Sequence, residues 1–372
     1  MDDDIFLKSI IEKDLIKYYK KEIRIRIRGA KKRFDSEKSE KLIKIKNGIE
    51  EQKSHRDLVC NSICPFTENG SLIQTGFKYI RGEPLVEKNV PNLDFLLFRR
   101  NEGSNYIILG ECKSSISSPG AIINETLERK QIVLDNLDYI KTDYLDIAIN
   151  AKVIIEYVIV CGPIEANQLI VQLSSELYNS SNHQDIIIWS RIIEKDCLKI
   201  NCFEPRRELS NCAFKHRDPA LRGRLRDGAI TGGCHFDVFP SSHTFIYLML
   251  IRKIAWKNGN SLFLTKEGLE ETLRKELYYC SPEFVNKKVG MIIDIAIKME
   301  FLIWDKHLNA FKLKISPISG LAFELALFKK WSDYKLKIEY EELLINERDQ
   351  LQDEVGRMRK YIPKSLFEYD EI

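Results

Sequence analysis

The hydrophobic pattern changes its period several times along the first part of the chain. Residues 5–20 and 37–62 carry apolar side chains at helical spacing. Between them, isoleucine and arginine alternate over residues 23–28. Alternation with a period of two is typical of a strand with one apolar and one basic face. The pattern therefore predicts a helix, a short basic strand and a second helix.

Short apolar runs alternate with helical stretches in the next part of the chain. The runs are bounded by glycine, proline and polar residues, as buried strands are, and they lie at 72–81, 93–98, 106–112, 153–161 and 185–190. Helical spacing occupies 122–145 and 165–178. The order of helix, three strands, helix, strand, helix and strand predicts an α/β fold.

Helical spacing returns near the C-terminus, at 245–256, 265–277 and 282–299, and a predicted hairpin follows at 301–314. Three helices followed by a hairpin resemble the winged helix-turn-helix fold. This resemblance implies that the third helix enters the major groove of DNA. A winged helix that serves protein contact or dimerisation is the alternative. Residues 321–362 then predict either one packed helix or a short two-stranded coil.

These changes of pattern divide the chain into five parts. The predicted parts are an N-terminal helix and basic strand (1–36), an α/β domain (37–203), a basic linker (204–240), a winged-helix domain (241–318) and a C-terminal helical segment (319–372). The linker also contains Cys212 and His216, separated by three residues as zinc ligands can be. No second clean pair accompanies them, so scattered free thiols are the favoured interpretation.

Composition narrows the class of protein. Apolar residues make up 44% and charged residues 30% of the 372 residues, which is typical of a soluble globular protein. No apolar run is long enough to span a membrane, and the start of the chain is acidic where a signal peptide is basic. Nine scattered cysteines favour a reducing compartment and a cytoplasmic location. The net charge of +3 is close to neutral and does not indicate whether the protein binds nucleic acid.

Two acids and a lysine interrupt the apolar runs at 93–98 and 106–112. Asp94 opens the first run, and Glu111 and Lys113 end the second. Side chains alternate along a strand, so Glu111 and Lys113 face the same side of the sheet, and Asp94 can reach that side if the two runs form a hairpin. Buried charges are normally paired or hold a metal ion. Two carboxylates beside an ammonium predict a Mg²⁺ site suited to phosphate chemistry.

Asp94 followed by Glu111-Cys112-Lys113 resembles the active-site pattern of the PD-(D/E)xK nuclease superfamily, which has the fold of type II restriction endonucleases. Pro91-Asn92-Leu93 stands where that pattern has a strict Pro-Asp pair. The resemblance spans about residues 40–200. It implies a restriction-endonuclease-like mixed sheet flanked by helices, to which the separately predicted winged-helix domain and C-terminal helix would be appended.

The resemblance also implies a mechanism and a set of roles. Asp94, Glu111 and the backbone carbonyl of Cys112 would hold Mg²⁺, and Lys113 would orient or activate the attacking water. Hydrolysis of double-stranded DNA would leave 5′-phosphate and 3′-hydroxyl ends. Related enzymes often add an acid from the preceding helix; Glu51 is preferred here, with Glu50 and Asp57 open. Cutting both strands needs two sites, which favours a homodimer.

Three groups of residues are predicted to contact DNA. The first is the basic face of the predicted strand, for which a charge-protected edge strand is the alternative. The second lies on the predicted helix at 122–145, at a position similar to that of the glutamine that some relatives place near the metal. The third occupies the early turns of the third winged-helix helix. The residues are Arg24, Arg26 and Arg28, then Lys130 and Gln131, then Asn286, Lys287 and Lys288.

Two other functions fit the same sequence. One is a DNA-binding regulator whose nuclease-like core is only a scaffold. The other is a different nuclease of the same superfamily, such as a junction resolvase, a transposon end-cutting enzyme or a defence nuclease. The residues do not specify a recognition sequence, a cut position or a sensitivity to methylation.

Overall fold

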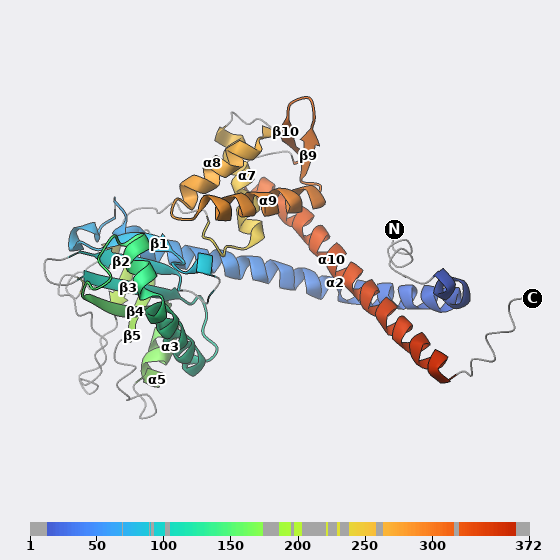
Figure 1. The fold of residues 1–372 in the computed structure, drawn as a ribbon, viewed down its shortest axis with the longest axis horizontal. Helices are drawn as coiled ribbons and strands as arrows, with labels where there is room; N and C mark the ends of the chain where they lie inside the picture. The colour runs from blue at the N-terminus through green and yellow to red at the C-terminus, as the bar shows by residue number, and fades with distance from the viewer. Residues whose placement is uncertain are drawn as a thin grey trace, which may run out of the picture. The chain divides into compact units, whose positions relative to one another are not determined.

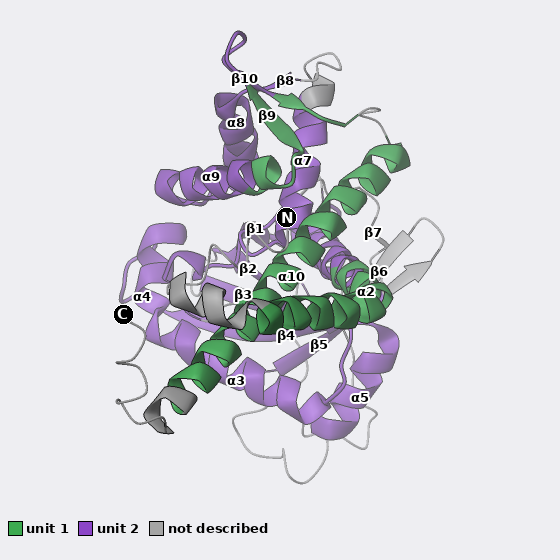
Figure 2. Ribbon diagram, turned by 90° about the vertical axis from the view of Figure 1, so that its right-hand side faces the viewer, with its two compact units in different colours: residues 1–48, 295–304, 312–372 green, residues 49–294, 305–311 purple. Residues whose placement is uncertain are grey.

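The chain forms two compact units (Figure 2). The structure is a computed structural model, which describes residues 13–68, 70–88, 90, 93–100, 105–173, 186–194, 197–202, 221, 229–230, 238–257, 263–315 and 320–361. Unit 1 comprises residues 1–48, 295–304 and 312–372, and unit 2 comprises residues 49–294 and 305–311. The predicted linker at 204–240, including Cys212 and His216, lies almost entirely outside the described residues.

A seven-stranded mixed sheet forms the centre of unit 2, and its first five strands are labelled in Figure 1. Its strands follow each other in chain order across the sheet. β1 to β3 are joined antiparallel, β3 to β5 parallel, and β5 to β7 antiparallel. The strands are β1 (Lys78–Gly82), β2 (Phe95–Arg99), β3 (Asn105–Cys112), β4 (Val153–Cys161), β5 (Ile186–Glu194), β6 (Cys197–Cys202) and β7 (Ala229–Ile230).

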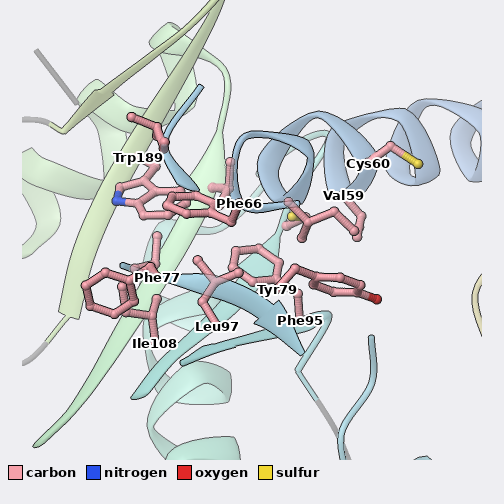
Figure 3. Close-up of a cluster of buried hydrophobic side chains, with 14 of the residues drawn as sticks. Val59, Cys60, Phe66, Phe77, Tyr79, Phe95, Leu97, Ile108 and Trp189 are labelled. Carbon is pink, nitrogen blue, oxygen red and sulfur yellow. The ribbon is translucent and has the colours of Figure 1, made fainter. Parts of the chain in front are cut away.

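Helices cover both faces of this sheet, because alternate side chains along each strand point to opposite sides. One face packs against the last turns of α2 (Lys13–Ile63), where Phe66 and Phe95 stack on Trp189 (Figure 3). The other face packs against α3 (Pro119–Asp135), α4 (Leu137–Tyr139), the π-helix η4 (Ile140–Tyr144) and α5 (Pro163–Leu173). The predicted α/β class with a mixed sheet flanked by helices is confirmed.

The predicted basic strand at 23–28 is wrong, because α2 is one continuous helix of 51 residues. Ile23, Ile27 and Ala30 lie four and three residues apart, so they fall on one helical face and are buried, whereas Ile25 is exposed. The helix also continues through the predicted domain boundary at 36/37. In the predicted strand at 72–81, only Lys78–Gly82 is extended; Ile73–Thr75 forms the 3₁₀-helix η2.

The apolar face of α2 in unit 1 packs against α10 (Gly320–Tyr361). Leu344, Leu351 and Val355 supply the α10 side of this contact. Ion pairs join the two helices at Arg26–Glu354, Arg33–Glu347 and Lys41–Glu339. The numbers rise along α2 as they fall along α10, so the helices are antiparallel. Of the two predicted forms of the C-terminal segment, the packed helix is the one found.

The remaining elements follow the predicted order of three helices and a hairpin. They are α7 (Thr244–Lys257), α8 (Lys266–Glu276), α9 (Pro282–Lys298), β9 (Leu302–Asp305) and β10 (Ala310–Leu313). The Thr265 hydroxyl caps α8 by accepting a hydrogen bond from the Gly268 amide at 3.0 Å. A short strand that the sequence did not predict, β8 (Phe263–Leu264), completes a three-stranded sheet in the order β8-β10-β9.

Within unit 2, the segment that carries α7 to α9 is attached to the first part of the sheet. The Ser281 amide donates to the Glu87 carboxylate at 2.6 Å, just before α9, and the Tyr278 hydroxyl donates to the Ile80 carbonyl at 3.3 Å. Glu87 belongs to the 3₁₀-helix η3 (Val86–Lys88). None of the described helices is long and apolar enough to cross a membrane.

Candidate functional site

Asp94, Glu111 and Lys113 lie at one end of the β2–β3 pair. The Asp94 amide donates to the Gly110 carbonyl at 2.8 Å, and the antiparallel register, continued by one residue, places Asp94 opposite Glu111. All three side chains line one cavity of about 510 Å³. Its other lining residues are Gln52, His55, Glu83, Val86, Val90, Leu93, Cys112, Ser114, Ser115, Arg129 and Ser241. The structure thus brings together the three residues that the sequence singled out.

The Asp94 carboxylate is held from two sides. Its Oδ1 lies 3.1 Å from His55 Nε2, and its Oδ2 accepts a hydrogen bond from the Cys112 amide at 2.5 Å. His55 comes from the C-terminal part of α2, which lies against the face of the sheet opposite to α3. Burial disfavours the charged imidazole, but the hydrogen bond to Asp94 and the attraction of its charge outweigh burial, so the pKa of His55 is raised.

Glu111 belongs to a closed ring of four charged side chains, formed with Lys113, Glu125 and Arg129. Nη1 of Arg129 donates to both Glu111 oxygens, at 2.7 and 2.6 Å, and Nη2 of Arg129 donates to Glu125. Nζ of Lys113 lies 2.8 Å from Glu111 and 3.1 Å from Glu125. Glu125 and Arg129 are one turn apart on α3, so this helix delivers both to the ring.

Burial and neighbouring charges set the protonation of the ring. Burial is the main cause that raises the pKa of Glu111, to about 7, and repulsion by Asp94 adds to it, while Lys113 and Arg129 act in the opposite direction. Burial lowers the pKa of Lys113, but the contacts with Glu111 and Glu125 outweigh burial, so this pKa is raised overall. Asp94 and Glu111 repel each other on the cavity wall, and a cation bound between them would relieve this repulsion.

Glu83 is a third acid on the cavity wall. Its carboxylate accepts hydrogen bonds from the Ser241 amide, at 2.8 Å, and from the Ser241 hydroxyl. Burial raises its pKa to about 7, Asp94 adds to the shift, and Ser241 opposes it. The backbone at Glu83 has φ of 48°, a region that side chains other than glycine seldom adopt. Such strain concentrates at functional sites.

Glu51 does not belong to this site: it is exposed and does not line the cavity. The reason is helical geometry. Gln52 and His55, three residues apart on α2, line the cavity, and Glu51 precedes them by one step of about 100° around the helix. The residue that α2 contributes to Asp94 is therefore a histidine instead of an acid. The other two candidates, Glu50 and Asp57, are also exposed.

The structure separates the predicted DNA contacts of α3 from its cavity-lining residue. Nζ of Lys130 lies 5.1 Å from the centre of the Tyr157 ring, and the Gln131 amide donates to Asp135 at 2.8 Å. Neither residue lines the cavity, whereas Arg129, one position earlier, does. Sequence reasoning missed Arg129, Glu125 and His55. The spacing of Glu125 and Arg129, four residues apart on a predicted helix, was the available signal.

The other predicted DNA contacts are divided between exposed and engaged side chains. On α2, Arg24 and Arg28 are exposed, while Arg26 binds Glu354 at 2.6 Å and Glu22 at 3.2 Å. On α9, Asn286 and Lys287 are exposed. Lys288 instead lies over aromatic rings, with its Nζ 5.2 Å from the Tyr247 ring centre and 5.5 Å from the Phe284 ring centre. Burial lowers the pKa of Lys288.

The donor set at Asp94 and Glu111 is compatible with a hard divalent cation. Among the described residues, no group of three or more His, Cys, Asp or Glu side chains is arranged to hold a metal ion. Mg²⁺, however, is commonly bound by one or two carboxylates together with water and substrate phosphate. Each carboxylate offers about four lone-pair positions, more than the two contacts made by Asp94 and the three made by Glu111 that are described above. Cys112 contributes its amide to Asp94, and its thiol is buried.

Comparison of the chain with protein-family models, with curated proteins and with solved structures finds no match in any of the three. A function for this protein is therefore inferred from the geometry of the cavity and from the residues around it.

Proposed function

We propose that the protein is a Mg²⁺-dependent DNA endonuclease with the active site of the PD-(D/E)xK superfamily. The observation that carries this proposal is the meeting of Asp94, Glu111 and Lys113 at the end of two antiparallel strands, on the wall of one cavity. Two acids and an amine arranged in this way suit the hydrolysis of a phosphodiester.

Each residue has a defined role in this proposal. Asp94 and Glu111 hold the cation, with the Cys112 carbonyl as a further ligand, and the Cys112 amide fixes the orientation of the Asp94 carboxylate. Bound Mg²⁺ supplies Lewis-acid activation of the phosphate and of the attacking water. Lys113 orients that water and offsets the negative charge that develops on the phosphate. The products carry 5′-phosphate and 3′-hydroxyl ends.

DNA binding is proposed for the segment that carries α7 to α9 and the sheet β8-β10-β9. Its element order is that of a winged helix-turn-helix. Asn286 and Lys287 are exposed on the early turns of α9, from which such a fold contacts bases. Arg24 and Arg28 are exposed on α2 and suit contacts with phosphates. A restriction endonuclease that cuts both strands as a homodimer is the specific form of the proposal.

Digestion of a supercoiled plasmid, with Mg²⁺ and with EDTA, tests the proposal. We expect cleavage only with Mg²⁺, and discrete fragments from a restriction enzyme. Asp94→Ala and Lys113→Ala should retain DNA binding and lose cleavage by about a thousandfold. Glu128→Ala is the matched control, because Glu128 is an exposed acid on the same helix as Glu125. Cleavage at the wild-type rate by both site variants would overturn the assignment.

A DNA-binding regulator with a catalytically inert core is the second candidate. The observation in its favour is that both oxygens of Glu111 accept hydrogen bonds from Arg129. This candidate predicts DNA binding in a gel-shift assay without plasmid cleavage at any Mg²⁺ concentration. Another nuclease of the superfamily would instead give a smear of fragments or prefer branched DNA.

A further inference from the structure

The four-residue ring at the cavity is electrically balanced. When Glu111 is ionised, it and Glu125 contribute two negative charges, and Lys113 and Arg129 contribute two positive charges. Three of the four side chains are well shielded from solvent, and the Glu111 side chain is only 4% exposed. The balance would be lost as soon as a divalent cation shared the charge of Glu111, because both of its basic partners would then be undercompensated.

We infer that Arg129 binds a DNA phosphate in the cavity once a divalent cation is bound by Asp94 and Glu111. Without the cation, Arg129 is bound to Glu111; the cation releases it to the phosphate. This inference rests on the proposed function, because it requires the cation site. It adds a substrate contact to that site and a reason for the cation and the DNA to bind together.

The geometry favours Arg129 for this role over other basic residues of α3. Arg129 lines the cavity together with Asp94 and Lys113, whereas Lys130 does not. Its guanidinium presents five N–H donors in one plane, a geometry that suits the oxygens of a phosphate. Nη2 is also bound to Glu125, one turn away on the same helix. That second contact keeps the guanidinium at the cavity while Nη1 changes its partner.

The exchange has a thermodynamic consequence. Arg129 and the cation both bind Glu111, so Arg129 weakens cation binding in the absence of DNA. When DNA is present, Arg129 transfers to the phosphate and no longer competes, so the two ligands strengthen each other's binding. By reciprocity, the factor by which the cation increases DNA affinity equals the factor by which DNA increases cation affinity. Removing Arg129 should reduce this factor.

Calorimetric titration with Mn²⁺, without DNA, tests the competition. We expect Arg129→Gln to bind Mn²⁺ about tenfold more tightly than the wild type. Arg129→Lys keeps the positive charge but cannot bind Glu111 and Glu125 through two separate nitrogen atoms. Its affinity for Mn²⁺ should therefore lie between those of the wild type and Arg129→Gln. Lys152→Gln is the matched control: it removes one positive charge from an exposed position of unit 2 outside the cavity lining, and should bind like the wild type.

Affinity for a short DNA duplex, measured in EDTA and in Ca²⁺, tests the second half of the inference. Ca²⁺ takes the same oxygen ligands as Mg²⁺. We expect Ca²⁺ to increase wild-type affinity about tenfold and to increase that of Arg129→Gln less than threefold. The Lys152→Gln control should retain the wild-type increase.

The outcomes separate this inference from the proposed function. If the wild type binds Mn²⁺ and Arg129→Gln binds it no more tightly, Arg129 does not compete and the inference is overturned while the nuclease proposal stands. If the wild type binds no Mn²⁺, even with DNA, both are overturned. Should Arg129→Gln fail to fold, as judged by its melting curve, Arg129→Lys decides: an affinity for Mn²⁺ no higher than that of the wild type contradicts the inference.

Discussion

Two groups of ion pairs in this protein use the same chemistry in different surroundings. In unit 2, Glu111, Lys113, Glu125 and Arg129 form a ring on the wall of a cavity. In unit 1, α2 and α10 are joined by pairs in which one partner is usually open to water, as in Arg33–Glu347, where the Arg33 side chain is 57% exposed. Water can replace a lost partner in the helix pair but cannot easily do so at Glu111, whose side chain is only 4% exposed.

The comparison explains why only one of these groups is a candidate for chemistry. Charges that water screens contribute little energy. On the cavity wall burial removes part of this screening, and burial is the main cause that raises the pKa of Glu111, with repulsion by Asp94 adding to it. The ring therefore combines stability with reactivity, whereas the helix pair mainly fixes how α2 and α10 align.

Glu111→Ala should give the largest effect. The substitution removes the shared partner of Lys113 and Arg129, and leaves two positive charges with Glu125 alone. We expect the free energy of unfolding to fall by about 4 kcal/mol, measured by urea denaturation in EDTA. Glu128→Ala, the exposed control on α3, should change it by less than about 0.5 kcal/mol. A similar loss from both variants would contradict the distinction between ring and surface.

Two glycines extend the comparison to the backbone. A Cβ on Gly110, in β3, would lie 1.9 Å from the Phe95 ring, whereas a Cβ on Gly29, in α2, would meet nothing within 4 Å. Gly110→Ala should therefore destabilise the protein by about 3 kcal/mol. Gly29→Ala should stabilise it by about 1 kcal/mol, because alanine favours the helix. Thermal melting of the two variants measures both, and stabilisation by Gly110→Ala would contradict the close β2–β3 register.

Glu83 is a buried acid whose direct contacts are neutral donors instead of a cation. Its pKa is raised to about 7, with Asp94 adding to the shift and Lys288 opposing it. The folded protein therefore binds this proton more tightly than the unfolded chain, and the resulting stability is present below about pH 4.5 and lost as the pH rises through 7. Relative to Glu83→Gln, the wild type should lose about 2 kcal/mol between pH 4.5 and pH 8. Denaturation across this range, in EDTA, measures the difference, and an unchanged difference would contradict the prediction.

The sequence predicted the sheet better than the first helix, for a physical reason. Strands at 93–98 and 106–112 are apolar on both faces, and this is sufficient to recognise buried strands. In the stretch at 23–28, alternation over six residues also places Ile23 and Ile27 four apart, which suits a helix equally well. The deciding contact is with Leu344 and Leu351, more than 300 residues away in the chain, and no local pattern reveals it.

The same limit applies to the candidate site. Asp94, Glu111 and Lys113 could be predicted because strand alternation and a hairpin fix their relative positions. His55 and Arg129 reach the cavity from α2 and α3, and the rotation of each helix about its axis depends on packing against the sheet. An error of one residue turns a helix by about 100°. Glu51 lies one position before Gln52, and Lys130 one position after Arg129, so each predicted residue is one such step away from a residue that lines the cavity.

The smallest predicted effect concerns Arg26 and Glu354 in the helix pair. Their side chains lie 2.6 Å apart, and the Glu354 side chain is 44% exposed. Burial disfavours the charge of Arg26, but Glu354 and Glu22 outweigh it and raise the pKa of Arg26. A double-mutant cycle with Arg26→Gln and Glu354→Gln should give a coupling below about 1 kcal/mol, and it should decrease further in 1 M salt.

The same cycle for Arg129 and Glu111 should give a larger coupling that changes less with salt, because both groups lie on the shielded cavity wall. Equal couplings in the two cycles would show that burial does not distinguish the two groups of charges.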